Sequence, residues 1–351
     1  MRTSLISIWH PNPTNKNHCR FVKKHFDVLD YSECLIGTYV KNKFVIYIKK
    51  KHLDYTTINR LVVLPCFRYS AFFHILVFNL ASAKFCFRNR KTDEFVVSFG
   101  LSVIWLSVFN FGQIYLIEHW SGWVRRRKLR IIFRKLLRNV ALYLPVSTRL
   151  VFKDINHVLI PNIIDDLFIN IPIAEREETH ATKRLIFVGR LEPVKNIEKI
   201  IYQFSTIPSA YDELVVVGDG TLLKNLKEHY QHNTKIKFTG ALFGNSVREA
   251  MDQCGTLVLH SRTENQPQVV IEALFRGLLV NVKEYESIQY LKQQLPFSDV
   301  LDTRSFREFL ESPKQVNFTL DDLNQNHIAL KNIYSKEAVR EFFKSIGLRV
   351  R

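Results

Sequence analysis

The 351-residue sequence lacks several features that would assign it to familiar classes of protein. Its five cysteines form no C-x-x-C pair, which favours a reducing compartment and argues against a zinc site. We find no internal repeat and expect no secretory signal. The most apolar stretch, residues 71–87, is interrupted by His74, Asn79 and Lys84. It falls short of the roughly 20 residues of a membrane span, so we interpret it as a buried helix.

Negative charge is scarce in the first half of the chain. Residues 1–165 contain 26 Lys and Arg against 9 Asp and Glu, whereas residues 166–351 contain 24 of each sign. The whole net charge of +17 therefore belongs to the first half. This asymmetry predicts an anionic partner for that half alone, with acidic lipid, a phosphorylated acceptor and nucleic acid as the alternatives.

The second half shows a regular alternation of strand and helix patterns. A polar segment at 174–183 suggests a linker, and after it short apolar runs are separated by helical patterns of about ten residues. The runs that suit buried strands are 184–189, 213–218, 235–240, 256–261 and 278–282. Strict alternation predicts a parallel sheet with helices on both faces. In the first half, a second and similar sheet is suggested by segments 4–9, 62–67, 95–100, 113–120 and 141–147.

Three loops at predicted strand ends carry chemistry that suits a ligand site. In open parallel sheets, ligands bind beyond the carboxyl ends of the strands, where these loops converge. The first loop contains Arg190 and Lys195, the second is Gly-Asp-Gly at 218–220, and the third contains Glu264 and Pro267. We interpret 218–220 first as a turn and second as a ligand contact.

The third loop leads into a predicted helix that begins at Pro267, a residue that suits a first helical turn. The free amides of Gln268, Val269 and Val270 would then point out of the helix end, where the dipole favours an anion. Glu272 follows roughly 7 Å along the helix axis, at about 1.5 Å per residue.

Two phosphates at this helix end could also be gripped by Arg190 and Lys195. Glu264 and Glu272 would flank them, and carboxylates accept hydrogen bonds from hydroxyls. A nucleotide sugar fits this arrangement, because its diphosphate lies between the hydroxyls of the ribose and those of the hexose.

Taken as a set, these segments resemble a known enzyme family. The donor half of family 4 glycosyltransferases (GT-B type, retaining, E-x7-E motif) is matched by GRLEPVKN (189–196), VVVGDGTLLKNL (215–226), FTG (238–240) and Glu264-x7-Glu272 followed by ALFRG. Segments 116–123, 144–150 and 158–168 are similar to upstream parts of the same family.

The resemblance implies an α/β fold with two Rossmann-like domains that face each other across a cleft. The expected domains are an acceptor-binding domain at 1–165 and a nucleotide-sugar-binding domain at 175–333. A C-terminal helix at about 334–351 is expected to cross back to the first domain.

The resemblance also implies roles for individual residues. Arg190 and Lys195 match the pair that neutralises the donor diphosphate, Glu272 the acid that holds the ribose, and Glu264 the acid near the transferred sugar. His119 matches a first-domain histidine that faces the sugar. The implied catalytic residues are therefore Glu264, His119, Arg190 and Lys195, and the implied donor-binding residues are Arg190, Lys195, Gly218, Gln268, Val269, Val270 and Glu272.

Two further features qualify the resemblance. No Asp-x-Asp motif follows a strand, so we expect no required metal or other cofactor, with a UDP- or GDP-sugar as co-substrate. The family usually has glycine in its first loop, but residues 10–25 contain none, which puts close backbone approach in doubt. Lys16, Asn17 and His18 could supply side-chain contacts there instead.

The segment 123–140 combines eight basic residues with one apolar stripe. The stripe is formed at helical spacing by Leu129, Ile132, Phe133, Leu136, Leu137 and Val140. One interpretation is a surface helix that packs this stripe on the first domain, and another is a helix that lies on anionic lipid through Arg125–Arg138. We expect no nucleic-acid partner, because no recognition module is visible.

These observations predict a glycosyltransferase that moves a sugar from a nucleotide-sugar donor to a glycan or lipid-linked glycan acceptor. We expect it to act in surface polysaccharide biosynthesis, in the cytoplasm and peripherally on the inner face of the membrane. The alternatives are a catalytically degenerate binding subunit of an assembly complex, and an epimerase or phosphorylase on the same architecture.

Overall fold

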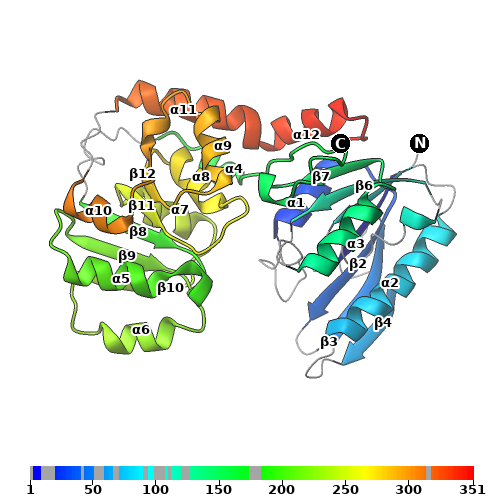
Figure 1. Ribbon diagram of the computed structural model, residues 1–351, viewed down its shortest axis with the longest axis horizontal. Helices are drawn as coiled ribbons and strands as arrows, with labels where there is room; N and C mark the ends of the chain where they lie inside the picture. The colour runs from blue at the N-terminus through cyan, green and yellow to red at the C-terminus, as the bar shows by residue number, and fades with distance from the viewer. Residues whose placement is uncertain are drawn as a thin grey trace. The chain divides into compact units, whose positions relative to one another are not determined.

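The computed structural model describes residues 3–8, 20–40, 43–50, 59–65, 71–89, 94–98, 107–109, 112–119, 126–173, 183–313 and 318–351. The chain divides into two compact units (Figure 1). Unit 1 comprises Met1–Ile163 and Val339–Arg351, and unit 2 comprises Ile164–Ala338. Each unit has its own hydrophobic core, built around its own sheet.

The sheet of unit 1 has seven strands in the order β4-β3-β2-β1-β5-β6-β7. The strands are β1 Thr3–Ile8, β2 Glu33–Val40, β3 Lys43–Lys50, β4 Asn59–Pro65, β5 Glu94–Ser98, β6 Gln113–Glu118 and β7 Leu142–Pro145. All neighbouring pairs are parallel except those that β3 makes with β2 and β4. The five predicted segments are present as strands, but the antiparallel hairpin of β2 and β3 was not predicted.

The crossovers of unit 1 place its helices on opposite faces of the sheet. The helices are α1 Arg20–Val28, α2 Ala71–Arg88 and α3 Arg127–Leu137, with a short turn η4 at Thr148–Leu150. The path β1-α1-β2 runs toward one edge, whereas β4-α2-β5 and β6-α3-β7 run toward the other. Because such crossovers are right-handed, α2 and α3 share one face and α1 covers the opposite face (Figure 1). Most of the C-terminal helix α12, Lys336–Ser345, also belongs to unit 1.

Helix α2 corrects the prediction of a buried helix over 71–87. One of its faces is buried, through His74, Phe78, Ser82, Phe85 and Cys86. The other face exposes four large apolar side chains, between 47% and 62% each, namely Phe73, Leu76, Leu80 and Phe87. The helix packs on β2 and β3 with its buried side, so the four exposed side chains are left outside the core.

Helix α3 packs most of its predicted stripe on unit 1. Phe133 and Leu137 are buried, and Leu129, Leu136 and Val140 are partly buried. The Phe133 ring meets Tyr143 of β7 edge-on, with 6.2 Å between ring centroids. Ile132 was predicted in the same stripe but is 52% exposed, because it lies at the rim of the helix face.

Unit 2 has a six-stranded parallel sheet in the order β10-β9-β8-β11-β12-β13. The strands are β8 Arg184–Val188, β9 Glu213–Val217, β10 Ile236–Gly240, β11 Thr256–Leu259, β12 Leu279–Val282 and β13 Leu301–Asp302. The first five lie within the predicted segments. The two-residue β13 is too short to leave a sequence pattern.

Helices cover both faces of this sheet. The helices are α4 Asp166–Ile169, α5 Ile197–Thr206, α6 Leu223–His229, α7 Asn245–Asp252, α8 Gln268–Phe275, α9 Glu286–Gln294, α10 Phe306–Glu311 and α11 Leu320–Tyr334, with the short turns η5 Pro193–Lys195 and η6 Ser298–Val300. The handedness of the crossovers puts α5 and α6 on one face and α7, α8 and α9 on the other. No helix in the described part of the chain has both the length and the hydropathy that a bilayer crossing needs.

Candidate functional site

The sheet of unit 2 reverses its direction of winding between two neighbouring strands, β8 and β11. The chain leaves β8 through α5 toward β9, and it leaves β11 through α8 toward β12, on the opposite face. Beyond the carboxyl ends of these strands, the two loops separate to opposite sides of the sheet. This is the position at which open α/β sheets bind ligands.

The loops after β8 and β11 are joined by three contacts. The Lys195 Nζ donates to Glu264 Oε1 at 2.6 Å, and the Asn196 Nδ2 donates to the His260 carbonyl at 3.2 Å. The backbone amide of Arg262 donates to the carbonyl of Val194 at 2.8 Å. Two residues that were predicted as parts of one site are therefore in direct contact, although 69 positions separate them.

The Lys195–Glu264 ion pair is partly shielded from solvent. Their side chains are only 21% and 12% exposed. A charge-assisted hydrogen bond of this kind is stronger than one between neutral groups, and it fixes both side chains. The pair therefore places a cation and a carboxylate together at the edge of the sheet.

A strained residue turns the chain directly after Lys195. Asn196 has φ 58° and ψ 27°, and it is the one non-glycine residue with positive φ in the described part of the chain. Asparagine tolerates this left-handed conformation better than most residues do. The turn directs the chain from η5 into α5.

Gly218 and Gly220 allow the backbone of the loop after β9 to approach that of the loop after β8. A Cβ on Gly218 would lie 1.8 Å from the Gly189 carbonyl oxygen, and a Cβ on Gly220 would lie 2.6 Å from that of Leu191. The amide of Leu191 donates to the carbonyl of Asp219 at 2.9 Å. The segment is thus a tight turn that locks the loop after β9 against the loop after β8.

Arg190 lies in this locked region, exposed at the end of β8. The next acid along the chain, Glu192, accepts hydrogen bonds from the Thr221 amide at 3.2 Å and the Thr221 hydroxyl at 2.8 Å. The hydroxyl hydrogen bond is the main reason that the pKa of Glu192 is lowered, and the charge of Arg190 adds to it. Glu192 therefore stays ionised and is held by the neighbouring loop.

The start of α8 differs from the prediction in two ways. Pro267 is the N-cap residue and the helix begins at Gln268, one position later than expected. The amide of Val270 already donates to the Pro267 carbonyl at 3.0 Å, so the prediction of a free Val270 amide is wrong. The first turn closes on its own cap, which leaves Gln268 and Val269 as the candidate amide donors.

Three buried polar atoms, two in the loop before α8 and one on its first residue, have no hydrogen-bond partner among the residues that the structure describes. They are the Oγ of Ser261, the Oγ1 of Thr263 and the Nε2 of Gln268. Buried polar groups are nearly always hydrogen-bonded in folded proteins, and each exception calls for an explanation. Three such groups within eight residues make this segment a candidate for contact with a polar ligand.

The second acid of the predicted pair, Glu272, lies on α8 and is partly exposed. Near Glu264, the structure adds a residue that the sequence did not suggest. The Tyr285 hydroxyl donates to the Ser261 carbonyl. Burial chiefly raises the pKa of Tyr285, and the negative charge of Glu264 raises it further.

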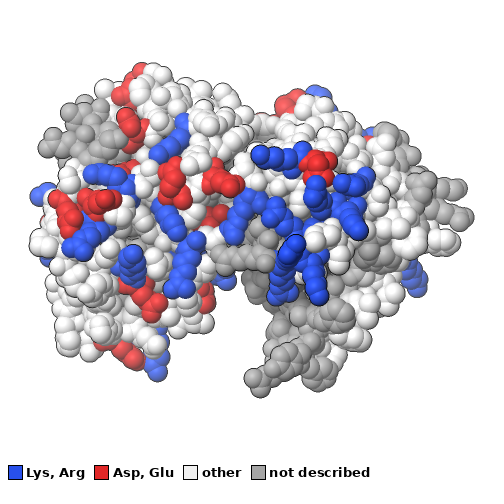
Figure 2. Space-filling model, viewed as in Figure 1, with Lys and Arg blue, Asp and Glu red and all other residues white. Residues whose placement is uncertain are grey.

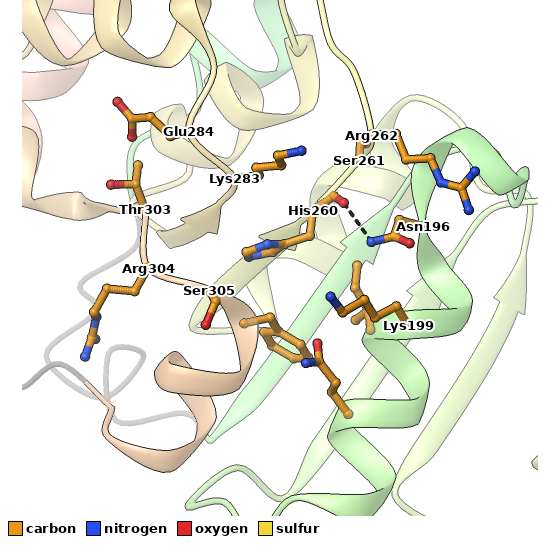
Figure 3. A pocket seen from close by; sticks show the side chains of 13 residues that line it. Asn196, Lys199, His260, Ser261, Arg262, Lys283, Glu284, Thr303, Arg304 and Ser305 are labelled. Atoms are coloured by element: carbon orange, nitrogen blue, oxygen red, sulfur yellow. Dashed lines mark hydrogen bonds between the residues drawn. The ribbon is translucent and has the colours of Figure 1, made fainter.

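A cavity of about 400 Å³ lies beside these loops at the same sheet edge (Figure 3). It shares Asn196, Ser261 and Arg262 with them, and its further charged or titratable lining residues include Lys199, His260, Lys283 and Arg304. Arg304 is paired with Asp302, and its side chain points away from Lys199 in the close view (Figure 3). Lys283 and Arg304 were missed because the strand-end rule was applied to only three loops, and these residues follow β12 and β13. Lys199 lies on α5, where the rule does not apply.

His260 is held in one tautomer inside this cavity. The amide nitrogen of Asn281 donates to the carbonyls of Asp302 and Arg304, at 3.3 Å each. Its oxygen therefore faces His260 and accepts from Nε2–H at 2.6 Å. Burial lowers the pKa of His260, and the charges of Lys199 and Lys283 lower it further, so the ring is neutral near pH 7.

His119 lies in unit 1, directly after β6, and is buried. Its ring stacks on that of His25 with 5.3 Å between centroids and 28° between planes. The His25 Nε2–H donates to the Pro161 carbonyl at 2.8 Å. Burial lowers the pKa of His25 to about 4 and that of His119 well below its ordinary value, so both rings are neutral near pH 7. No motif in the sequence points to His25.

Four residues of the sequence-based prediction lie outside the described residues, namely Lys16, Asn17, His18 and Arg125. Within the described part of the chain, no group of three or more His, Cys, Asp or Glu side chains is arranged to hold a metal ion. The remaining predicted donor residues all belong to unit 2.

Known proteins resemble both the segment that carries these loops and the fold as a whole. Residues 172–289, which contain both loops and α8, match the family described as glycosyl transferases group 1. Among solved structures, Anabaena HepE in complex with UDP has a TM-score of 0.66 at 14% identity, with 99% of each chain covered. Sucrose-phosphate synthase from Thermosynechococcus elongatus has a TM-score of 0.65 at 15% identity, over 99% of this chain and 98% of the other.

The chain has the GT-B fold. Both units are covered by these structural matches, so the predicted α/β architecture of two Rossmann-like domains is confirmed as a fold. A curated relative, the UDP-Gal:alpha-D-GlcNAc-diphosphoundecaprenol alpha-1,3-galactosyltransferase of Escherichia coli, is 34% identical over 99 residues. That match covers 26% of this chain and about a quarter of the relative's length.

Proposed function

We propose that this GT-B protein is a glycosyltransferase that moves a sugar from a nucleotide sugar to a glycan or lipid-linked glycan. The observation that carries the proposal is the Lys195–Glu264 pair at the switch between β8 and β11. It lies inside the segment that matches the glycosyl transferases group 1.

The donor diphosphate is proposed to bind between Arg190, Lys195 and the first amides of α8. As the glycosidic bond breaks, negative charge grows on the leaving diphosphate, and fixed cations stabilise that charge. Lys195 is already positioned by Glu264, so it needs little reorganisation when the donor arrives. We propose that these cations allow transfer without a required metal. Retention of configuration is proposed from the resemblance to family 4 alone.

The two acids have different proposed partners. Glu272 is assigned to the ribose hydroxyls, and Glu264 to the hydroxyls of the transferred sugar. The unpartnered atoms of Ser261, Thr263 and Gln268 supply further hydrogen bonds in the same loop. Gly218 is proposed to allow close approach of the nucleotide, in addition to its structural role.

We propose UDP as the nucleotide. Support comes from HepE, which was solved with UDP, and from the E. coli relative, whose name specifies UDP-Gal. His119 is proposed to contact the sugar from unit 1. Because its ring is neutral near pH 7, it would orient a hydroxyl through a hydrogen bond rather than supply a positive charge.

The acceptor is proposed to be lipid-linked, with the protein bound peripherally to the cytoplasmic face of a membrane. The relative acts on a diphosphoundecaprenol-linked sugar by its name. Support in this chain comes from the charge surplus of residues 1–165 and from the basic segment Arg125–Arg138. The precursor of a capsule or lipopolysaccharide is the substrate class that we propose.

The proposal is tested by titrating UDP and UDP-sugars onto the protein and then measuring hydrolysis and transfer. We expect UDP to bind, and Lys195→Ala to weaken binding by tenfold or more, on the order expected for a lost charged hydrogen bond. The exposed Lys224 of α6, which pairs with Glu228, provides a matched control. Binding without turnover on any acceptor would favour the degenerate subunit, and no binding of any nucleotide would contradict the proposal.

A further inference from the structure

The exposed large apolar side chains are distributed unevenly between the two units. Unit 2 has four in its described part: Tyr202 on α5, Phe243 in the loop before α7, and Leu320 and Ile328 eight positions apart on α11. Unit 1 has ten in its described part, of which eight lie on α2, α3 and the residues that precede β6. The eight are Phe73, Leu76, Leu80, Phe87, Val108, Phe109, Ile131 and Ile132. Contiguous exposed apolar surface of this kind marks an interaction site.

The four residues on α2 form a single stripe. Phe73, Leu76, Leu80 and Phe87 are separated by three, four and seven positions, so they lie on one side of the helix. Lys84, also exposed, falls between Leu80 and Phe87 on the same side. A long lysine stem can lie along apolar surface while its ammonium reaches a polar layer.

All eight residues are on the same face of the unit 1 sheet. Helices α2 and α3 share that face because both crossovers run in the same direction. The connection from β5 to β6 also runs that way, and the Ser107 hydroxyl in it donates to the Leu136 carbonyl of α3 at 3.3 Å. We call this surface the α2–α3 face, defined by the eight apolar residues and the exposed cations of α3.

The α2–α3 face is strongly cationic along α3. Seven basic residues and no acidic residue occur between positions 126 and 138. All seven are exposed, namely Arg126, Arg127, Lys128, Arg130, Arg134, Lys135 and Arg138. Figure 2 shows Lys and Arg gathered over α3, whereas few charged side chains cover α2. Asp154 pairs with Arg134 and Arg138, which leaves most of the positive charge uncompensated.

We propose that the α2–α3 face is a lipid-binding surface that inserts the α2 stripe into the interface of an anionic bilayer. An apolar stripe beside a row of cations is the combination that binds such interfaces. The cations of α3 meet anionic headgroups, while Phe73, Leu76, Leu80 and Phe87 enter the boundary with the acyl chains. The inference rests on the proposed function, because the role of this surface would be to bring unit 1 to a lipid-linked acceptor.

Charge argues against two other occupants of this face. A second copy of the chain would place the cationic α3 of one molecule near that of another, and such like-charge contacts are costly. A nucleic acid would match the cations but would leave the apolar stripe of α2 without a partner. An anionic bilayer satisfies both parts of the surface at once.

Vesicle flotation tests the proposal, with phosphatidylcholine vesicles that either contain or lack phosphatidylglycerol. The stripe variant is Phe73→Ser/Leu80→Ser/Phe87→Ser, and the charge variant is Arg127→Glu/Lys128→Glu/Lys135→Glu. The matched control is Phe243→Ser/Ile328→Ser, which removes apolar side chains of similar exposure from unit 2. Circular dichroism and UDP titration of each variant check the fold and the donor site independently.

We expect the wild type and the control to float with the anionic vesicles only. The stripe variant should lose roughly tenfold or more in partitioning, because three large apolar side chains no longer enter the interface. The charge variant should bind weakly, and its residual binding should no longer depend on salt. If a variant misfolds, the single changes Leu80→Ser and Phe87→Ser carry the test, each with a smaller loss.

The proposal is overturned if the wild type does not float with anionic vesicles, or if a folded stripe variant floats as well as the wild type. It is also overturned if the wild type sediments as a dimer that the stripe variant dissociates. UDP binding separates this inference from the proposed function. Vesicle binding without any nucleotide binding would support the lipid-binding surface and contradict the proposed glycosyltransferase function.

Discussion

Both units consist of a sheet covered by helices, but their surfaces differ in charge and in exposed apolar side chains. Unit 2 has a fully parallel sheet, and residues 164–338 contain 20 Lys and Arg against 24 Asp and Glu. Unit 1 has a mixed sheet, the whole net positive charge of the chain in residues 1–165, and a face with apolar side chains exposed on two helices. The two proposals use this difference, with a donor site at the sheet edge of unit 2 and a lipid-binding surface on unit 1.

The candidate site residues of the two units differ in the same way. In unit 2, an ionised pair, Lys195 and Glu264, joins two strand-end loops. In unit 1, two neutral histidines, His25 and His119, are stacked in a buried position. Substitutions in each unit should therefore change different observables: charge-dependent donor binding in unit 2, and pH-dependent stability in unit 1.

The largest effect is expected for Glu264→Gln. Its carboxylate both positions Lys195 and is assigned to the transferred sugar, so transfer should fall by roughly 100-fold to 1,000-fold. UDP binding should change far less, because Lys195 keeps its charge. Steady-state kinetics and UDP titration check this, with Glu228→Gln in the exposed pair of α6 as the control. Full activity of Glu264→Gln would contradict a catalytic role for the Lys195–Glu264 pair.

Lys195→Ala should act on binding and stability together. It leaves Glu264 without its cation at a position that is only 12% exposed, which should cost about 1–3 kcal/mol of unfolding free energy. The double variant Lys195→Ala/Glu264→Gln should be more stable than the sum of the single changes predicts, because a neutral amide needs no cation. Chemical denaturation of the wild type, the two single variants and the double variant measures this coupling. Strictly additive changes in unfolding free energy would show that the ion pair does not contribute to stability.

Gly218→Ala should destabilise unit 2 by about 1–3 kcal/mol. A Cβ there would lie 1.8 Å from the Gly189 carbonyl oxygen, so the two loops must separate. Gly240→Ala is the control, since it also has positive φ but nothing lies within 4 Å of its Cβ. Equal unfolding free energies for the two variants would contradict the account of the 218–220 turn.

Acid should weaken unit 1 through His25 and His119. Their pKa values are lowered in the folded state, His25 from 6.5 to about 4, so the unfolded chain binds more protons between these values. The stability that depends on neutral His25 is therefore present above pH 6.5 and is lost as the pH falls toward 4, at a cost on the order of 3 kcal/mol.

Hydrogen exchange locates this effect within the molecule. Protection of α1 and β6 should fall as the pH is lowered from 6.5 to 4, after correction for the intrinsic exchange rate. In a His25→Gln variant this pH dependence should be reduced, because one of the two buried rings is gone. Protection that falls equally in the wild type and the variant would exclude His25 as its source.

The smallest effect is expected in the cavity of unit 2. Removing a positive charge with Lys283→Ala should raise the pKa of His260, because Lys283 lowers it in the wild type. The rise should be small beside the effect of burial, since burial is the larger cause of the lowered pKa and stays in place. Histidine resonances followed by NMR over a pH series measure it. An unchanged pKa would show that Lys283 does not face this ring.

The sequence predicted unit 2 better than unit 1 for a physical reason. Strands buried on both faces are continuous apolar runs, so five strands of unit 2 could be recognised from composition alone. The segment KFVIYIKK of β3 was not recognised, because it is bracketed by lysines and runs antiparallel, which breaks the expected alternation of strand and helix. In both units, the apolar runs that were predicted as strands do belong to the hydrophobic core.

Other features depend on tertiary contacts that no local pattern contains. Hydropathy identified α2 as apolar but could not show that only one of its faces is covered. The strand-end rule placed Lys195 and Glu264 at one sheet edge but not in contact. The stacking of His25 on His119 follows from how α1 packs near the end of β6, and nothing in the spacing of the two histidines indicates it.

The most direct test of the central claim is a calorimetric titration of UDP onto the wild type, Lys195→Ala and the control Lys224→Ala. The account predicts that UDP binds the wild type and the control equally, and that Lys195→Ala weakens binding by tenfold or more. Equal UDP affinity in all three proteins, or no UDP binding by the wild type, would contradict it.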